Sequence, residues 1–116
     1  GDYAIVSGLS AVHQFVKIGA HVMIGGGAMV RKDVPPFITA AGEPLSYAGV
    51  NSVGLKRRNF SQEEINEIQT LYRTLYQSGM NVSQAVNRIK ETYSKGPEAD
   101  AILNFIERSD RGLIRK

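Results

Sequence analysis

The chain has 116 residues, 42% of them hydrophobic and 22% charged, which is typical of a folded domain and excludes a disordered chain. It has no cysteine, so disulfides and thiolate metal sites are excluded, which suits a reducing compartment. The net charge of +3 is modest, and no stretch has the length of a membrane helix or the pattern of a signal peptide. We therefore expect a cytoplasmic protein without a transmembrane segment.

Residues 1–36 contain a repeat with a period of six. Aliphatic side chains recur at this interval, and a second set of mostly small or branched side chains follows four positions after each. The first register is Val6, Val12, Ile18, Ile24 and Val30, and the second is Ser10, Val16, Val22, Ala28 and Val34. Because helices and strands have periods of 3.6 and 2, this spacing predicts a parallel β-helix whose first register faces inward.

The repeat also predicts where the solenoid turns and ends. Gly8, Gly19 and Gly25 are expected at tight corners, where a positive φ is often needed. Pro35-Pro36 lacks two backbone donors, which predicts the end of strand pairing. Five hexads make fewer than two coils, so we expect the sequence, which opens at Gly1 rather than a methionine, to start inside a larger domain.

After the prolines, residues 37–60 mix glycine, proline and polar residues, and we predict an extended connection there. From Ser61 onward the apolar period is helical, and "SQEE" is a capping box that starts a first helix. Asn81 with Gln84 predicts the start of a second helix, and Gly96-Pro97 that of a third. Residues 61–116 are thus predicted to form a three-helix domain, giving a mixed β-then-α chain.

Three stretches carry a family resemblance: "AVHQFVKIGAHVMIGGGAMVRKDVPPF", "GVNSVGLKRRNFS" and "RSDRGLIR". They closely resemble the C-terminal part of bacterial acyl-[acyl-carrier-protein]–UDP-N-acetylglucosamine O-acyltransferases, hexapeptide-repeat enzymes of lipid A biosynthesis. The resemblance implies the end of a left-handed β-helix, a homotrimer, and transfer of a β-hydroxyacyl group to the sugar 3-hydroxyl. It also implies acyl carrier protein and UDP-N-acetylglucosamine as partners, with no cofactor beyond the carrier's phosphopantetheine.

The family's general base is a histidine in an earlier coil, whereas this sequence contains only His13 and His21. We therefore expect no acyl transfer by the 116-residue chain alone. The alternative is a non-catalytic module for trimerisation and carrier-protein docking. A nucleic-acid binder is a third possibility, which the absence of aromatic residues interleaved with the basic run disfavours.

His13 and Gln14 lie between the inward Val12 and Val16, so their side chains should leave the solenoid wall. The resemblance places both at the substrate site, with His13 supporting the base; the alternatives are a histidine bonded to a neighbouring coil and a solvated amide. His21, one hexad further, is expected to have a structural or subunit-contact role.

The only triple basic run is Lys56-Arg57-Arg58, and guanidinium groups can form paired hydrogen bonds with phosphate oxygens. The resemblance assigns the UDP diphosphate to Arg57 and Arg58 and the uridine to Asn51. The alternative is a solvated basic surface. At Val53 the family's best-known members carry a carboxylate, so that contact is missing from this sequence.

The "IGGGAMV" stretch lacks the Lys-Ser/Thr ending of a phosphate-binding loop and lies inside the six-residue register. We interpret it as solenoid wall. The resemblance places Met23 and Gly26 on the groove for the acyl chain, with Gly26 leaving room for a longer chain. No metal site is expected.

The helical region offers tyrosines and arginines as further candidates. Tyr72, Tyr76 and Tyr93 fall on apolar helix faces and are expected in the core with the hydroxyl at its edge. By resemblance, four arginines could attract the acidic carrier protein, with ordinary surface charge as the alternative: Arg73, Arg108, Arg111 and Arg115.

Overall fold

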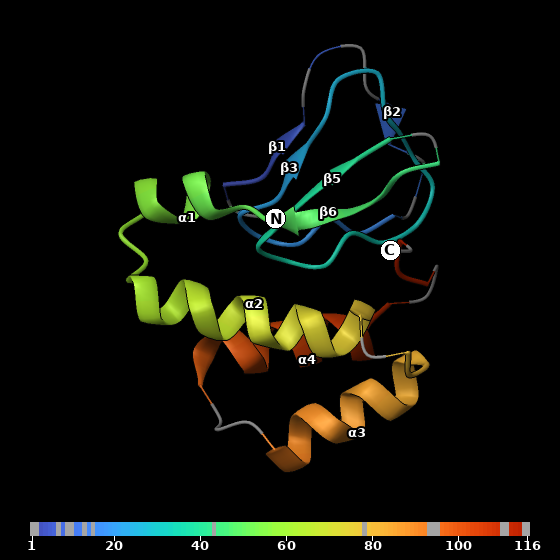
Figure 1. Ribbon diagram of the computed structural model, residues 1–116. Coiled ribbons are helices and arrows are strands. Elements are labelled where there is room, and N and C mark those ends of the chain that lie inside the picture. The colour runs from blue at the N-terminus through green and yellow to red at the C-terminus, as the bar shows by residue number, and fades with distance from the viewer. Residues whose placement is uncertain are drawn as a thin grey trace.

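Short stacked strands lie above a group of helices in the computed structural model of the chain (Figure 1). The structure describes residues 3–6, 8, 11–12, 14, 16–42, 44–77, 79–92, 96–109 and 112–114. Within these ranges no helix is both long and apolar enough to span a membrane.

The strands stack in successive coils, with paired residues eighteen positions apart in the first interval and sixteen in the next. Strand β1 (Ile5–Val6) pairs in parallel with β3 (Met23–Ile24), and β2 (Ala11–Val12) pairs in parallel with β4 (Met29–Val30). A parallel bridge between Ile18 and Val34 lies on a third side. Three hexads per coil are confirmed for Val6 and Val12, which meet the residues eighteen positions later, whereas Ile18 meets the residue sixteen positions later.

Burial follows the position of a residue in the stack. Ile24 and Val30 have no exposed surface, as the six-residue register predicts. Val6 and Val12, which precede them by one coil, are 40% and 45% exposed because only the following coil covers them. The register thus gives the direction of these side chains.

The prediction that pairing ends at Pro35-Pro36 is wrong. Strand β5 (Ile38–Ala41) follows the prolines and pairs in parallel with β3. The ladder bond before the prolines is accepted by the Val34 carbonyl, and the bond after them is donated by the Phe37 amide. The two prolines therefore occupy a corner between ladder bonds, where no backbone donor is required.

The assignment of Val34 to the second register is also wrong. Val34 bridges to Ile18, sixteen residues earlier, which makes it the partner of a first-register residue. The chain reaches this side of the coil in four residues from Val30, instead of the six that separate Val12 from Ile18. The shorter corner keeps Val34 fully buried.

The positive φ expected for the corner glycines is not observed. Gly8, Gly19 and Gly25 are absent from the described residues with positive φ. Gly19 is required for space, because a Cβ there would lie 2.4 Å from the Pro36 nitrogen. Close stacking of the coil on the proline corner therefore explains this glycine.

The segment 37–60, expected as an extended connection, forms a hairpin and a helix. Strand β6 (Ser46–Val50) runs antiparallel to β5, with an irregularity between Thr39 and Ala40. Helix α1 (Ser52–Arg57) follows and is capped by the Asn51 side chain. The hairpin covers the free edge of β5, which an extended strand end would leave open.

The three helices predicted after Ser61 are present as α2 (Gln62–Gln77), α3 (Val82–Thr92) and α4 (Pro97–Glu107). Reciprocal capping bonds start α2 between Ser61 and Glu64 and precede α3 between Asn81 and Gln84. At α4, Gly96 is the N-cap and Pro97 the first helical residue. Local chemistry therefore determines where these helices begin.

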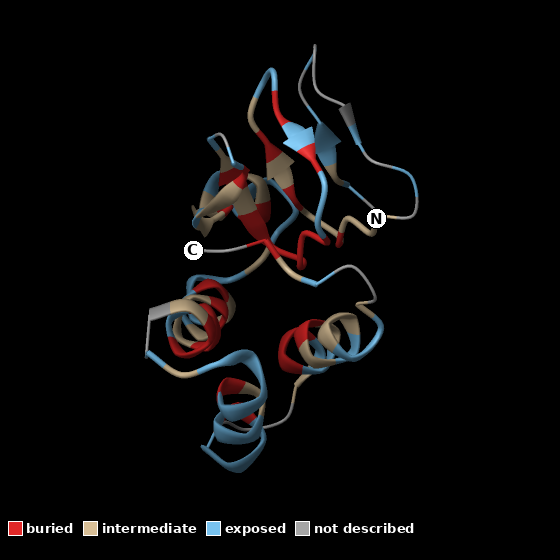
Figure 2. Ribbon diagram, turned by 90° about the vertical axis from the view of Figure 1, so that its right-hand side faces the viewer, coloured by how far each residue is buried: buried red, intermediate tan, exposed pale blue. Residues whose placement is uncertain are grey.

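Buried side chains concentrate where the coils meet the helices (Figure 2). The buried face of α2 packs beneath the hairpin, and the chain returns after α4 to pair Leu113 with Asp33 (Figure 1). The buried Asp33 carboxylate accepts bonds from the Lys17 amide at 2.7 Å and the Ser109 hydroxyl at 2.5 Å. The C-terminal segment is thereby attached to the last coil.

Candidate functional site

Helix α1 is attached to the coils through one residue, Asn51. Its backbone amide donates to the Phe37 carbonyl at 2.8 Å, and its side-chain amide donates to the His21 carbonyl at 3.0 Å. The side-chain oxygen accepts from the Gly54 amide at 3.2 Å. Because Asn51 is buried, these bonds fix the start of α1 against the corner formed by His21 and Phe37.

That corner recurs in three successive coils. Tyr3, His21 and Phe37 all have positive φ, at 58°, 58° and 73°, a conformation uncommon for residues with side chains. Their rings stack, with centroids 5.1 Å apart for Tyr3 and His21 and 5.9 Å apart for His21 and Phe37. The Phe60 ring meets the His21 ring edge-on at 5.0 Å. We call these four residues the aromatic corner.

A pocket of about 300 Å³ lies between this corner, β3 and α1. Its lining includes Tyr3, His21, Met23, Asn51, Arg57 and Arg58. Four residues that the sequence assigned to substrate are thus brought together: Met23, Asn51, Arg57 and Arg58. Two consecutive arginines in the lining make the pocket suitable for an anion with several oxygens, such as a diphosphate.

Val53 also lines the pocket and is 64% exposed in the first turn of α1. An apolar side chain at this position offers no hydrogen bond to a ligand. Recognition by hydrogen bonding would then depend on other groups in the pocket, such as the side-chain amide of Asn51, whose nitrogen carries two hydrogens.

Other assigned residues lie elsewhere. Gln14 and Gly26 are both exposed and are absent from the lining of this pocket. His13 lies outside the described residues. The pocket therefore brings the candidate diphosphate contacts together with Met23. The roles of His13 and Gln14 at the substrate site remain predictions.

His21 was expected to be structural, and the structure adds its presence in the lining of the pocket. Tyr3 also lines the pocket and was not singled out from the sequence. The signal that could have found Tyr3 is the coil period, since it precedes His21 by the same eighteen residues that separate paired strands.

A second hollow, of about 470 Å³, lies beside His21 and Arg58 and reaches the starts of α2 and α4. It contains Glu64 and Glu98, whose carboxyl groups share a hydrogen bond. Burial, followed by that bond, raises the pKa of Glu98. The Ser61 amide, followed by the bond to Glu98, lowers the pKa of Glu64. The two pKa values are displaced in opposite directions, so the proton shared by the pair is held preferentially by Glu98.

The core position predicted for the tyrosines is confirmed for Tyr72 and Tyr76, but the Tyr72 hydroxyl is buried instead of lying at the edge of the core. Tyr72 is fully buried and Tyr76 partly so, and both stack with Tyr47 of β6. The Tyr72 hydroxyl donates to the Pro36 carbonyl and the Tyr76 hydroxyl to the Ile114 carbonyl. Burial raises the pKa of both phenols, so they remain donors at neutral pH. Tyr93 lies outside the described residues.

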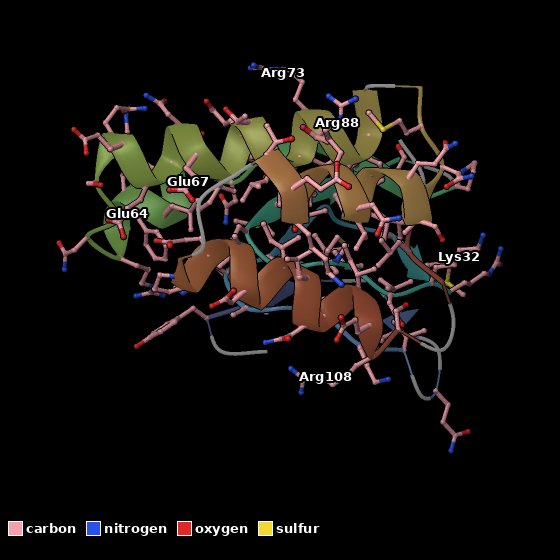
Figure 3. All side chains as sticks on the ribbon, turned by 90° about the horizontal axis from the view of Figure 1, so that it is seen from below. Lys32, Glu64, Glu67, Arg73, Arg88 and Arg108 are labelled. Carbon is pink, nitrogen blue, oxygen red and sulfur yellow. The ribbon has the colours of Figure 1, made fainter. Side chains whose placement is uncertain are left out.

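Of the arginines suggested for carrier-protein docking, the structure describes Arg73 and Arg108. Figure 3 shows these two at opposite edges of the molecule. Arg111 and Arg115 lie outside the described residues. Within the part of the chain that the structure describes, no three histidine or carboxylate side chains are grouped to hold a metal ion.

Comparison with known proteins gives consistent matches. A family model described as UDP N-acetylglucosamine O-acyltransferase, domain 2, matches residues 33–114. Acyl-[acyl-carrier-protein]–UDP-N-acetylglucosamine O-acyltransferases from Burkholderia lata and Thiobacillus denitrificans are 44% and 43% identical to the chain. Each match covers 99% of this chain and 45% of the relative, so the chain spans less than half the length of these relatives.

Solved structures agree with these matches. A UDP-N-acetylglucosamine acyltransferase from Bacteroides fragilis superposes with a TM-score of 0.94 at 46% identity, over 97% of this chain and 44% of that chain. The Francisella novicida UDP-N-acetylglucosamine acyltransferase gives 0.93 at 37% identity, over 99% and 42%.

Proposed function

Because the chain belongs to the UDP-N-acetylglucosamine O-acyltransferase family, we propose that it forms the C-terminal part of such an enzyme. The proposed reaction moves a β-hydroxyacyl group from acyl carrier protein to the 3-hydroxyl of UDP-N-acetylglucosamine, the first step of lipid A synthesis. The proposal includes a left-handed β-helix, a cytoplasmic homotrimer, and no cofactor besides the phosphopantetheine of the carrier protein.

The observation that carries the proposal is the pocket beside α1. Arg57 and Arg58 contribute two cations to its wall, and Asn51 contributes an amide. A nucleoside diphosphate presents two phosphates to the guanidinium groups and a base and ribose to the amide. Charge-assisted hydrogen bonds are the strong class of polar contact, so these arginines supply most of the affinity for the diphosphate.

The chemistry of the reaction requires a base at the sugar hydroxyl. The hydroxyl oxygen attacks the thioester carbonyl, the base takes the hydroxyl proton, and the carrier's thiol leaves with a proton. We assign a supporting role near the sugar to His13 and Gln14, with the base itself outside this sequence. The acyl chain is proposed to run along Met23 and Gly26, and Met23 lines the same pocket.

The second candidate is a non-catalytic module for trimerisation and carrier-protein docking. The observation that favours this candidate is that the family's base histidine is absent from this sequence, whose histidines are His13 and His21. The two candidates differ in their need for the nucleotide pocket, because a docking module has no use for a diphosphate.

Titration of the chain with UDP tests the proposed function. Arg57→Ala and Arg58→Ala should each weaken binding by about 10- to 150-fold, because a hydrogen bond to a charged group contributes roughly 1.5–3 kcal/mol. Arg88→Ala is the matched control, since Arg88 is exposed on α3 and also loses one positive charge. Equal affinities for all three variants would contradict the assignment, and acyl transfer by the 116-residue chain at the rate of a full-length relative would refute its expected inactivity.

A further inference from the structure

Arg58 is linked to the aromatic corner in two ways, by its own side chain and by the chain segment that follows it. The guanidinium carbon of Arg58 lies 4.3 Å from the centroid of the Tyr3 ring, a cation–π distance. Two residues after Arg58, the Phe60 ring packs against His21. Both the side chain of Arg58 and the backbone that follows it are therefore held by the same set of stacked rings.

The backbone of α1 ends in a fixed geometry at this point. The Arg58 amide donates to the carbonyls of Gly54 and Leu55, and the Phe60 amide also donates to Leu55, at 3.0 Å. Asn59 between them has a positive φ of 68°. The chain thus reverses direction at Asn59, which turns Phe60 back toward the corner.

The ring of Tyr3 is itself supported. It is 59% exposed, but its other neighbour is the His21 ring at an interplanar angle of 26°, and His21 stacks in turn on Phe37. All three residues share the uncommon positive φ, which directs their side chains to one corner. The backbone strain of three successive corners is offset by ring contacts that end on Arg58.

We propose that Tyr3, supported by His21, is a positioning residue that holds the Arg58 guanidinium in the wall of the α1 pocket for a diphosphate. The inference rests on the proposed function, because it assumes that Arg58 binds phosphate oxygens. Long arginine side chains lose rotamer freedom when they bind, so an arginine already held on a ring loses less on binding. Tyr3 then raises the affinity through Arg58, without a polar contact of its own.

The decisive measurement is a double-mutant cycle with UDP as the probe. Tyr3→Leu removes the ring and should weaken UDP binding about two- to fivefold, the range of a cation–π contact at an exposed site. Tyr3→Phe keeps the ring without the hydroxyl and should restore the affinity. In an Arg58→Ala background, Tyr3→Leu should have no further effect.

A ligand-independent readout accompanies the cycle. The side-chain NMR signals of Arg58, assigned by their loss in Arg58→Ala, should be shifted upfield by the ring, and Tyr3→Leu should remove this shift. Val6→Ala is the control for the loss of an exposed apolar side chain in the same coil, because Val6 is 40% exposed and absent from the pocket lining. Melting curves of each variant verify that the fold is retained.

The possible outcomes separate the two claims. If UDP binds but Tyr3→Leu is as tight as the native chain, or weakens binding equally with and without Arg58, the positioning role is overturned. If the native chain fails to bind UDP, the proposed function is overturned together with the diphosphate role of Arg58. An Arg58 signal that does not respond to Tyr3→Leu overturns the contact itself, whatever UDP does.

Discussion

Substitution of Gly19 by alanine tests how closely the coils stack on the proline corner. A Cβ at this position would lie 2.4 Å from the Pro36 nitrogen, 2.6 Å from its Cα and 2.9 Å from the Pro35 carbonyl carbon. These are backbone atoms of two residues with fixed φ, and the Pro36 carbonyl is also held by the Tyr72 hydroxyl. The neighbours therefore cannot yield as a flexible side chain would.

Overpacking of this kind typically costs about 1–3 kcal/mol, and rigid neighbours place Gly19→Ala near the upper limit. At roughly 4 °C per kcal/mol for a chain of this size, the melting temperature should fall by about 10 °C. Thermal and urea unfolding followed by circular dichroism measure the change.

Gly8→Ala is the matched control for this substitution. A Cβ at Gly8 would have no atom within 4 Å, and neither glycine has a positive φ, so both variants carry the same backbone change. The control should stay within about 0.5 kcal/mol of the native chain. If Gly19→Ala also stays within that range, the close approach of the two coils is refuted.

Three further predictions concern the helical junction, the C-terminal segment and the acyl groove. The pKa of Glu98 is raised, so its contribution to stability is full below the ordinary value of 4.5 and is lost as pH rises through the raised value. Glu98→Gln should therefore increase the melting temperature more at neutral pH than at pH 4. Melting temperatures of the variant and the native chain that run parallel with pH would contradict the proton shared with Glu64. Asp33→Ala removes the acceptor of two partly buried donors, the Lys17 amide and the Ser109 hydroxyl, and should lower the free energy of unfolding by about 1 kcal/mol for each. In urea unfolding this loss should exceed that of Ser109→Ala. Equal losses would refute a role of Asp33 in joining both donors. In an active enzyme that contains this part, Gly26→Met should change the preference for shorter over longer acyl donors by at least about tenfold. The reason is that two methylenes of the acyl chain contribute roughly 1.6 kcal/mol when they are buried. An unchanged preference across a series of chain lengths would exclude Gly26 from the groove.

The coil pairing could be predicted from sequence because stacking repeats the same environment in every coil. Val6 meets Ile24 and Val12 meets Val30 at an interval of three hexads. The capping box at Ser61 could be predicted for the opposite reason, since its bonds join residues only three positions apart. Both signals are residue patterns with a fixed spacing, which is long for the coil pairing and short for the capping box.

The proline corner could not be predicted in this way. Pro35-Pro36 ends regular structure wherever a ladder bond needs a donor, and only the coil register shows that none is needed there. The same register explains why bulky residues take the conformation expected of glycine. Tyr3 and His21 adopt a positive φ because ring stacking across coils compensates, which a single hexad does not reveal.

For the candidate site, the sequence indicated which residues could bind a ligand, but it did not show which residues support them. The basic run left a solvated surface open, and the family resemblance assigned the diphosphate to Arg57 and Arg58. The ring that contacts Arg58, that of Tyr3, comes from fifty-five positions earlier. Asn51 illustrates the consequence, because its side chain already bonds to the Gly54 amide and the His21 carbonyl. A loss of nucleotide affinity in an Asn51 variant would therefore report displacement of α1 as well as any lost contact. Arg57, exposed in the last turn of α1, can be removed with both anchors of the helix in place, so its variant isolates the contribution of charge.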